Sequence, residues 1–157
     1  LDSMIELKEE VEDYICIKKN SSKFKSNRKK EHSSTIKEIE SPSGLKIQIG
    51  GNNRQNELIS LKKGKKGDLW FHAQETPGSH VVLKSSDGLV DETDIQLAAD
   101  LASFFSRARG NKITPIIMVP IENLQRISGS LPGTVSHRGG KVLWGKAERA
   151  AKYFHQK

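Results

Sequence analysis

The residues best suited to chemistry gather in one short stretch of the chain. Between positions 68 and 84, the sequence DLWFHAQETPGSHVVLK contains an aspartate, two histidines and a serine. Ser79, either histidine and Asp68 could in principle supply the nucleophile, base and orienting carboxylate of a hydrolase. The two histidines, His72 and His80, could equally begin a zinc site. Whether these side chains can meet depends on the secondary structure that carries them.

The alternation of polar and apolar residues in this stretch predicts two antiparallel strands joined by a turn. Pro77 and Gly78 suit the second and third turn positions, where proline fixes φ and glycine accepts a positive φ. A five-residue loop then sets the register, which pairs these residues across the strands: Asp68 with Lys84, Leu69 with Leu83, Trp70 with Val82, Phe71 with Val81, His72 with His80 and Ala73 with Ser79.

The register divides the hairpin into two unlike faces. One face is apolar or small and predicts a core: Leu69, Phe71, Ala73, Ser79, Val81 and Leu83. The other face mixes rings and charges: Asp68, Trp70, His72, His80, Val82 and Lys84. We expect this second face to be open, with rings that stack on unpaired bases and lysines that hold phosphates. The alternative is a helix that covers this face and makes Trp70 a core residue with its N–H hydrogen-bonded inside.

The same register argues against catalysis and against a metal site. Ser79 lies on the face opposite both histidines, so a hydrogen bond between nucleophile and base cannot form. Asp68 is about 13 Å from His72 along the strand, and a zinc site normally needs three or four ligands. We therefore predict no catalytic residue, no metal and no cofactor. A plainer alternative is that the histidines only satisfy local hydrogen bonds.

Two closely spaced motifs carry a resemblance to a known family. DLWFH at 68–72 and PGSHVV at 77–82 resemble the signature of the NFACT-R domain. That domain is the RNA-binding module of ribosome quality-control factors of the NEMF type, also known as fibronectin-binding-protein-A-like proteins. GNNRQNEL at 51–58 and PGTV at 132–135 resemble further elements of the family, which usually has an arginine where Gly51 stands. The resemblance covers about residues 35 to 146.

The resemblance implies a function for the chain. It implies a module that binds tRNA or rRNA, within a cytoplasmic factor that binds the large ribosomal subunit carrying a stalled nascent chain. Such a factor recruits tRNA for template-free C-terminal tailing, together with domains N-terminal to this module. Two alternatives stay open: a protein-interaction or adhesion module of the fibronectin-binding type, and an accessory domain for RNA modification.

Composition is compatible with an RNA partner. The 157 residues carry a formal net charge of +7, which favours an anionic ligand. Hydrophobic residues make up 34% and charged residues 29%, as in a folded unit with solvated segments. The single cysteine, Cys16, excludes an intramolecular disulfide and fits a reducing cytoplasm. No apolar run approaches the ~20 residues of a membrane span, so no membrane partner is expected.

The chain divides into three predicted parts. Residues 1–17 have the spacing of an amphipathic helix, and the resemblance implies the end of a coiled coil. Residues 18–34 are rich in Lys and Arg and predict a flexible basic linker, which serves either as a tether or as a phosphate-contacting arm. Residues 35–157 form the RNA-binding domain. The chain starts in the middle of a helical pattern, so we expect it to be part of a longer protein.

Patterns within 35–157 predict an α+β fold, a mixed and mainly antiparallel sheet with one long and one shorter helix packed on it. The expected elements are a hairpin of 35–40 and 45–49, a helix from Asn53 to Lys63, a long helix from Glu92 to Arg109, a strand at 113–121, a hairpin of 134–137 and 141–144 about Arg138-Gly139-Gly140, and a helix at 147–155.

The expected nucleic-acid contacts combine the open hairpin face, the Asn-Asn helix entry and the nearby cations. They are Asn52, Asn53, Arg54, Lys63, Lys65, Lys66, Asp68, Trp70, His72, His80, Lys84, Arg138 and Lys141.

Overall fold

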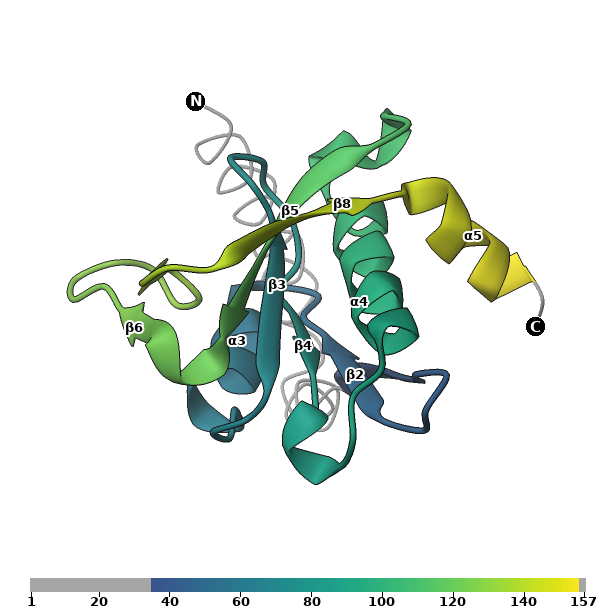
Figure 1. Ribbon diagram of the computed structural model, residues 1–157. Coiled ribbons are helices and arrows are strands. Elements are labelled where there is room, and N and C mark those ends of the chain that lie inside the picture. The colour runs from purple at the N-terminus through teal and green to yellow at the C-terminus, as the bar shows by residue number, and fades with distance from the viewer. Residues whose placement is uncertain (1–34, 156–157) are drawn as a thin grey trace, which may run out of the picture.

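The computed structural model describes residues 35–155 (Figure 1). The helix end predicted for residues 1–17 and the basic linker predicted for 18–34 lie outside the described residues. Within the described part of the chain, no helix is long and apolar enough to cross a membrane.

The centre of the fold is a six-stranded sheet in which every strand pair is antiparallel. In spatial order its strands are β1 (Lys37–Glu40), β2 (Lys46–Ile49), β4 (Val81–Leu83), β3 (Leu69–Ala73), β5 (Thr114–Pro120) and β8 (Lys141–Gly145). A separate ribbon pairs β6 (Leu124–Arg126) with β7 (Val135–His137).

Helices flank the sheet on both sides (Figure 1). The α-helices are α3 (Asn53–Glu57), α4 (Glu92–Phe104) and α5 (Ala147–His155). A π-helical turn, η1 (Leu58–Lys62), continues α3, and three short 3-10 turns are η2 (Ser85–Asp87), η3 (Arg107–Gly110) and η4 (Ile121–Asn123). This arrangement confirms the predicted α+β fold with its mainly antiparallel sheet and its long and shorter helix.

The central hairpin of β3 and β4 has the predicted register, with Phe71 opposite Val81 and Trp70 opposite Val82. The role predicted for Gly78 is wrong, because the positive φ in the turn belongs to Glu75, at 54°. A Cβ on Gly78 would lie 2.8 Å from the Cβ of Ser106, just beyond α4. The absence of a side chain at Gly78 therefore lets the hairpin turn lie close to the backbone of Phe105 and Ser106. Pro77, next to it, is buried.

One face of the sheet packs against α4, and α5 packs against α4 in turn. Asp91 caps α4 and forms a capping box with Asp94, which satisfies the first free N–H groups of the helix. The helix ends at Phe104, earlier than predicted, because Ser106 caps the 3-10 turn that follows. Its small residues, Ala98, Ala99 and Ala102, are fully buried and let the helix lie close to the strands.

The other face carries a second core, so the prediction that this face is open is wrong at Trp70. Trp70 is only 3% exposed, and it packs in one cluster with Ile59, Val82 and Val119. The segment from α3 through η1 covers one part of this face, and Ile121 and Leu124 cover another. The alternative of a covered face is confirmed by the burial of Trp70, but the expected internal hydrogen bond of its N–H does not form within residues 35–155. The strand pattern could not reveal which distant segments would cover the face.

The predicted hairpin of β7 and β8 does not form. Strand β7 pairs with β6, and β8 pairs with β5 to become the edge of the main sheet. Pairing with the seven-residue β5 satisfies the backbone of β8, whereas β7 leaves the sheet and brings Val135 onto the second core. Gly139 and Gly140, at φ 67° and 119°, turn the chain between the two sheets.

We predict that Trp70→Ala and Phe71→Ala destabilise the domain to a similar extent, by about 3–5 kcal/mol, because each empties one of the two cores. Urea denaturation of both variants measures this. Trp144→Ala is the matched control, since Trp144 is 55% exposed, and it should change stability by less than about 1 kcal/mol. A Trp70→Ala variant as stable as Trp144→Ala would contradict the second core.

Candidate functional site

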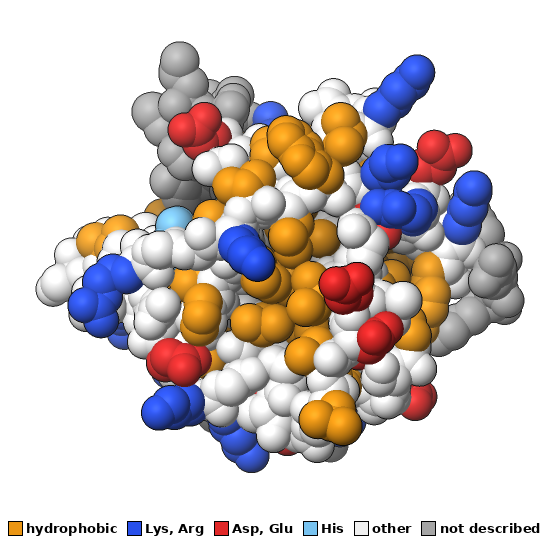
Figure 2. Space-filling view, in the orientation of Figure 1, with side chains coloured by type: hydrophobic (Ala, Val, Ile, Leu, Met, Phe, Trp, Pro, Cys, Tyr) orange, Lys and Arg blue, Asp and Glu red, His pale blue; other side chains and the backbone are white. Residues whose placement is uncertain are grey.

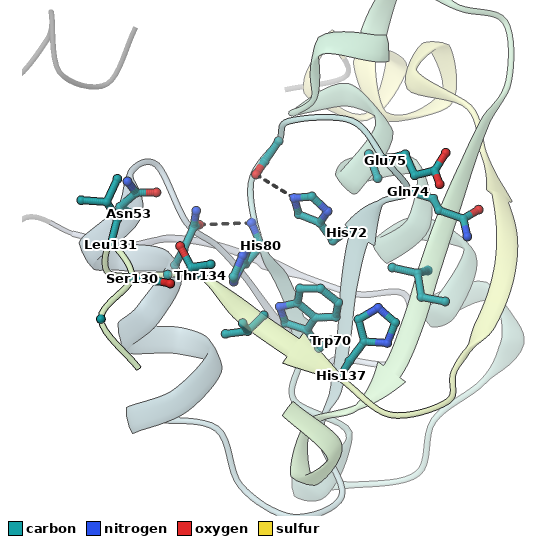
Figure 3. A pocket seen from close by; sticks show the side chains of 17 residues that line it. Asn53, Trp70, His72, Gln74, Glu75, His80, Ser130, Leu131, Thr134 and His137 are labelled. Carbon is teal, nitrogen blue, oxygen red and sulfur yellow. Dashed lines mark hydrogen bonds between the residues drawn. The ribbon is translucent and has the colours of Figure 1, made fainter. Parts of the chain in front are cut away.

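A pocket of about 830 Å³ opens on the second face of the sheet, at the turn end of the β3–β4 hairpin (Figure 3). Strand β3 contributes Trp70 and His72, the turn contributes Gln74 and Glu75, and His80 precedes β4. The opposite wall comes from the start of α3 and from the loop at 129–135, and β7 adds His137. Segments far apart in the sequence therefore share one cavity.

Trp70 and three histidines form a ring cluster at this pocket (Figure 3). The rings of Trp70 and His72 are parallel, with centroids 5.6 Å apart. His80 stands perpendicular to Trp70 at 5.1 Å, and His137 lies 6.0 Å from it. The cluster combines parallel and perpendicular ring contacts, in which Trp70 and His80 are buried and His72 is half-buried.

The two hairpin histidines are neutral at physiological pH. Burial, with the neighbouring His72 ring, lowers the pKa of His80 from 6.5 to about 3. Burial likewise lowers the pKa of His72. Because a carbonyl oxygen can only accept, Nε2 of His72 donates to Gly78 O at 3.2 Å, which leaves Nδ1 as an acceptor. These rings supply hydrogen-bonding groups rather than positive charge.

Trp70 holds an unused donor at the pocket. Its Nε1 is buried and has no hydrogen-bond partner among residues 35–155. Figure 3 shows this nitrogen turned toward the side of the pocket on which Ser130 and Thr134 lie. An unpaired buried N–H typically destabilises a folded protein by about 1–3 kcal/mol.

The loop at 129–135 forms its wall by close contact with α3. Gly133 has a φ of +85°, and a Cβ there would lie 2.8 Å from Asn53 O. Asn56, buried beneath the loop, accepts a hydrogen bond from the backbone N–H of His80 at 3.1 Å. Asn53 was expected at the site, whereas Asn56, Ser130, Thr134 and His137 were not. The PGTV motif at 132–135 was the available signal for this wall.

Charge is almost absent from the pocket lining. Among the lining residues, all in the described part of the chain, none is Lys or Arg, and the one acidic residue is Glu75. Its positive φ of 54° is uncommon for a residue with a side chain and is often seen at functional turns. The lining is therefore polar and aromatic but not cationic.

The expected cations lie outside the pocket and in two groups. Arg54 and Arg138 are exposed and adjoin the lining residues Asn53 and His137 in sequence, and Lys141 is exposed at the start of β8. The exposed Lys63, Lys65 and Lys66 instead precede β3, before the end of the strand that lies away from His72. The side chain of Asn52 caps α3 by accepting from Gln55 N at 2.9 Å.

Asp68 and Lys84 do not line an open face, which corrects their expected position. Both are buried, and they form an ion pair with each other. Burial acts to raise the pKa of Asp68, but the Lys84 ammonium and hydrogen bonds from Ser86 outweigh it and lower the pKa. Lys84 also donates to Lys63 O at 3.1 Å. The pair joins the hairpin to the lysine-rich loop, so neither side chain is exposed for RNA.

The site offers little for catalysis. His80 Nδ1 lies 2.8 Å from Ser60 Oγ, but Ser60 is buried and does not line the pocket. A histidine with a pKa of about 3 is also a weak base. Within residues 35–155, no group of three His, Cys, Asp or Glu side chains could hold a metal ion.

Stability should fall as the pH drops from about 6.5 to 4.5, because the unfolded His80 binds a proton that the folded state, with a pKa of about 3, still excludes. The slope expected from this residue is up to about 1.4 kcal/mol per pH unit, and His72 adds in the same direction. Urea unfolding of the wild type and His80→Gln across this range measures it. Equal slopes in the two proteins would contradict the low pKa.

Lys84→Met should destabilise the domain by about 3–5 kcal/mol, because it leaves the Asp68 carboxylate buried without its partner. The double variant Asp68→Asn with Lys84→Met removes both charges and should recover much of that loss. Unfolding free energies of the three proteins test this. No recovery in the double variant would show that hydrogen bonding, not charge pairing, dominates at this position.

Comparison with known proteins identifies the family of this chain. Residues 35–139 match the family described as the NFACT protein RNA binding domain. The chain is 37% identical over 110 residues to the Rqc2 homolog RqcH of Bacillus subtilis, covering 70% of this chain and 19% of that protein. It is 42% identical over 97 residues to the Rqc2 homolog RqcH of Streptococcus suis, covering 62% of this chain and 17% of that protein.

A solved structure is also similar. The C-terminal part of the fibronectin/fibrinogen-binding protein from Streptococcus suis superposes with a TM-score of 0.69 at 36% identity, covering 75% of this chain and 48% of that one. The chain spans about a fifth of the length of the curated relatives it matches. The family match includes the whole pocket, and the chain belongs to the NFACT protein RNA-binding domain family.

Proposed function

We propose that residues 35–155 are the RNA-binding module of a ribosome-associated quality-control factor. The observation that carries this proposal is that the family match, 35–139, contains every residue of the pocket and the exposed Arg54 and Arg138 beside it. Cations on the rim position the RNA backbone, while rings and uncharged polar groups inside the pocket contact bases.

The placement of the cations supports a division between backbone contacts outside the pocket and base contacts inside it. Arg54 and Arg138 adjoin the pocket residues Asn53 and His137 in sequence, Lys141 begins β8, and Lys63, Lys65 and Lys66 precede β3. Figure 2 shows one face on which apolar side chains gather near the centre and most Lys and Arg lie toward the edges. Phosphate contacts spread in this way hold a structured RNA without selecting its sequence.

For the whole protein, the family relationship supports a more specific role. We place the module in a cytoplasmic factor that binds the large ribosomal subunit with a stalled nascent chain and recruits tRNA for template-free tailing. The relatives named Rqc2 homolog RqcH motivate this assignment. In it the module holds RNA and needs no catalytic residue of its own, while the rest of the protein supplies further contacts.

A second candidate is protein binding, which the name of the similar Streptococcus suis structure motivates. Strand β8 is an edge of the sheet and exposes Val142 and Trp144, as a protein-binding strand would. Salt separates the two candidates, because phosphate-driven binding weakens steeply as salt rises and an apolar interface does not.

The chain should bind tRNA with a Kd on the order of micromolar and a negative salt slope. Arg54→Gln with Arg138→Gln should weaken binding and reduce the slope by about 1 per removed contact, without changing the unfolding free energy. Lys152→Gln, an exposed position on α5, which packs against α4, is the control and should alter neither quantity. Binding that does not respond to salt would favour the protein-binding candidate.

A further inference from the structure

We infer that the pocket beside Trp70 receives one unpaired RNA base, turned out of its stack, while the sugar–phosphate backbone stays at the rim. This inference rests on the proposed function and specifies how that function is performed. It differs from stacking on an open sheet face, because the base enters a walled cavity. The supporting observations are the size and rings of the cavity, its lack of cations and its unused donor.

The cavity suits a flat, uncharged group. Its volume of about 830 Å³ falls in the range usual for small-molecule sites, and one floor residue, Trp70, is only 3% exposed. The Trp70 and His72 rings are parallel and the His80 ring is perpendicular to both, and the half-buried His72 is the most exposed of these three rings for a base to contact. Base stacking on aromatic side chains is tolerant of sequence, as a general RNA-binding module requires.

The distribution of charge favours an uncharged base inside the pocket and the phosphates at its rim. A phosphate inside the cavity would meet the Glu75 carboxylate and two neutral histidines, with no Lys or Arg among the described lining residues. Outside, Arg54 and Arg138 adjoin opposite walls through Asn53 and His137. The favourable arrangement therefore places the base inside and the flanking phosphates outside.

Unused polar groups explain how a base could be held by its edge. The Trp70 N–H is buried, faces the pocket wall that carries Ser130 and Thr134, and has no partner within residues 35–155. Every nucleobase has ring or carbonyl acceptors that such a donor can reach. His72 Nδ1 is an acceptor on the same side of the sheet. A bound base would thus satisfy a donor that the protein alone leaves unpaired.

The test compares three blunt RNA duplexes of equal length: one with a single bulged nucleotide, one with an abasic residue at the bulge, and one without a bulge. The intact bulge should bind about 5- to 100-fold more tightly than the abasic one, while all three show the same salt slope. Ser130→Trp fills the pocket and should abolish the preference. Ser128→Trp, an exposed position on the same loop outside the lining, should retain it.

Two further variants report on Trp70 itself. Trp144→Phe leaves Trp70 as the sole tryptophan, and its fluorescence should be quenched by the intact bulge but not by the abasic duplex. Trp70→Phe keeps an aromatic ring and removes the N–H, so the preference for the intact bulge should fall about 2- to 10-fold. Its melting temperature, measured alongside, shows that the variant is folded.

The possible results are distinct. Equal affinity for the three duplexes with a normal salt slope would overturn the base pocket and leave the proposed RNA binding intact. No salt-dependent binding to any duplex would overturn both proposals. Quenching of Trp70 by free adenosine or uridine, without quenching by the bulged duplex, would assign the pocket to a small ligand and overturn the inference for RNA.

Discussion

Strand β3 is buried on both faces, and the rest of the fold depends on covering it. Phe71 and Trp70 are neighbours in sequence, yet strand alternation sends them into two different cores. Helix α4 covers one face, and the α3–η1 segment covers the other together with Ile121 and Leu124. The buried Asp68–Lys84 pair holds one end of the hairpin, and the close contact of Gly78 with Ser106 holds the other. Both covering layers are thereby anchored to the same pair of strands.

The second covering layer is incomplete, and the site occupies the part left open. Around Trp70 the cover is tight, whereas near His72 the start of α3, the loop at 129–135 and His137 leave a pocket over the sheet. Partial cover explains the chemistry of the site. It removes enough water to keep His72 and His80 neutral, and it leaves the Trp70 N–H without a partner. A fully packed layer would have removed the cavity, and an open face would have left the histidines free to take up protons near neutral pH.

Solvent access also distinguishes charged residues that lie near the same end of the hairpin. Lys84 and Lys63 are both lysines near the same end of the hairpin, but Lys84 is buried against Asp68 while Lys63 is exposed. The first stabilises the fold and the second is available to an anion. Family membership and the exposed arginines beside the pocket fit an RNA ligand whose backbone stays in solvent.

Local sequence patterns determined most of the strands and helices of this protein. The hairpin register, the edge hairpin of β1 and β2, the helices and β5 follow from alternation, caps and turn residues, which act over a few positions. Tertiary structure decided what lies over Trp70, that β8 pairs with β5 instead of β7, and that Asn56, Ser130 and His137 meet the hairpin. Those contacts join segments up to dozens of residues apart. The sequence could show which strand face was amphipathic, but only packing of the whole chain determined how much of that face water could reach.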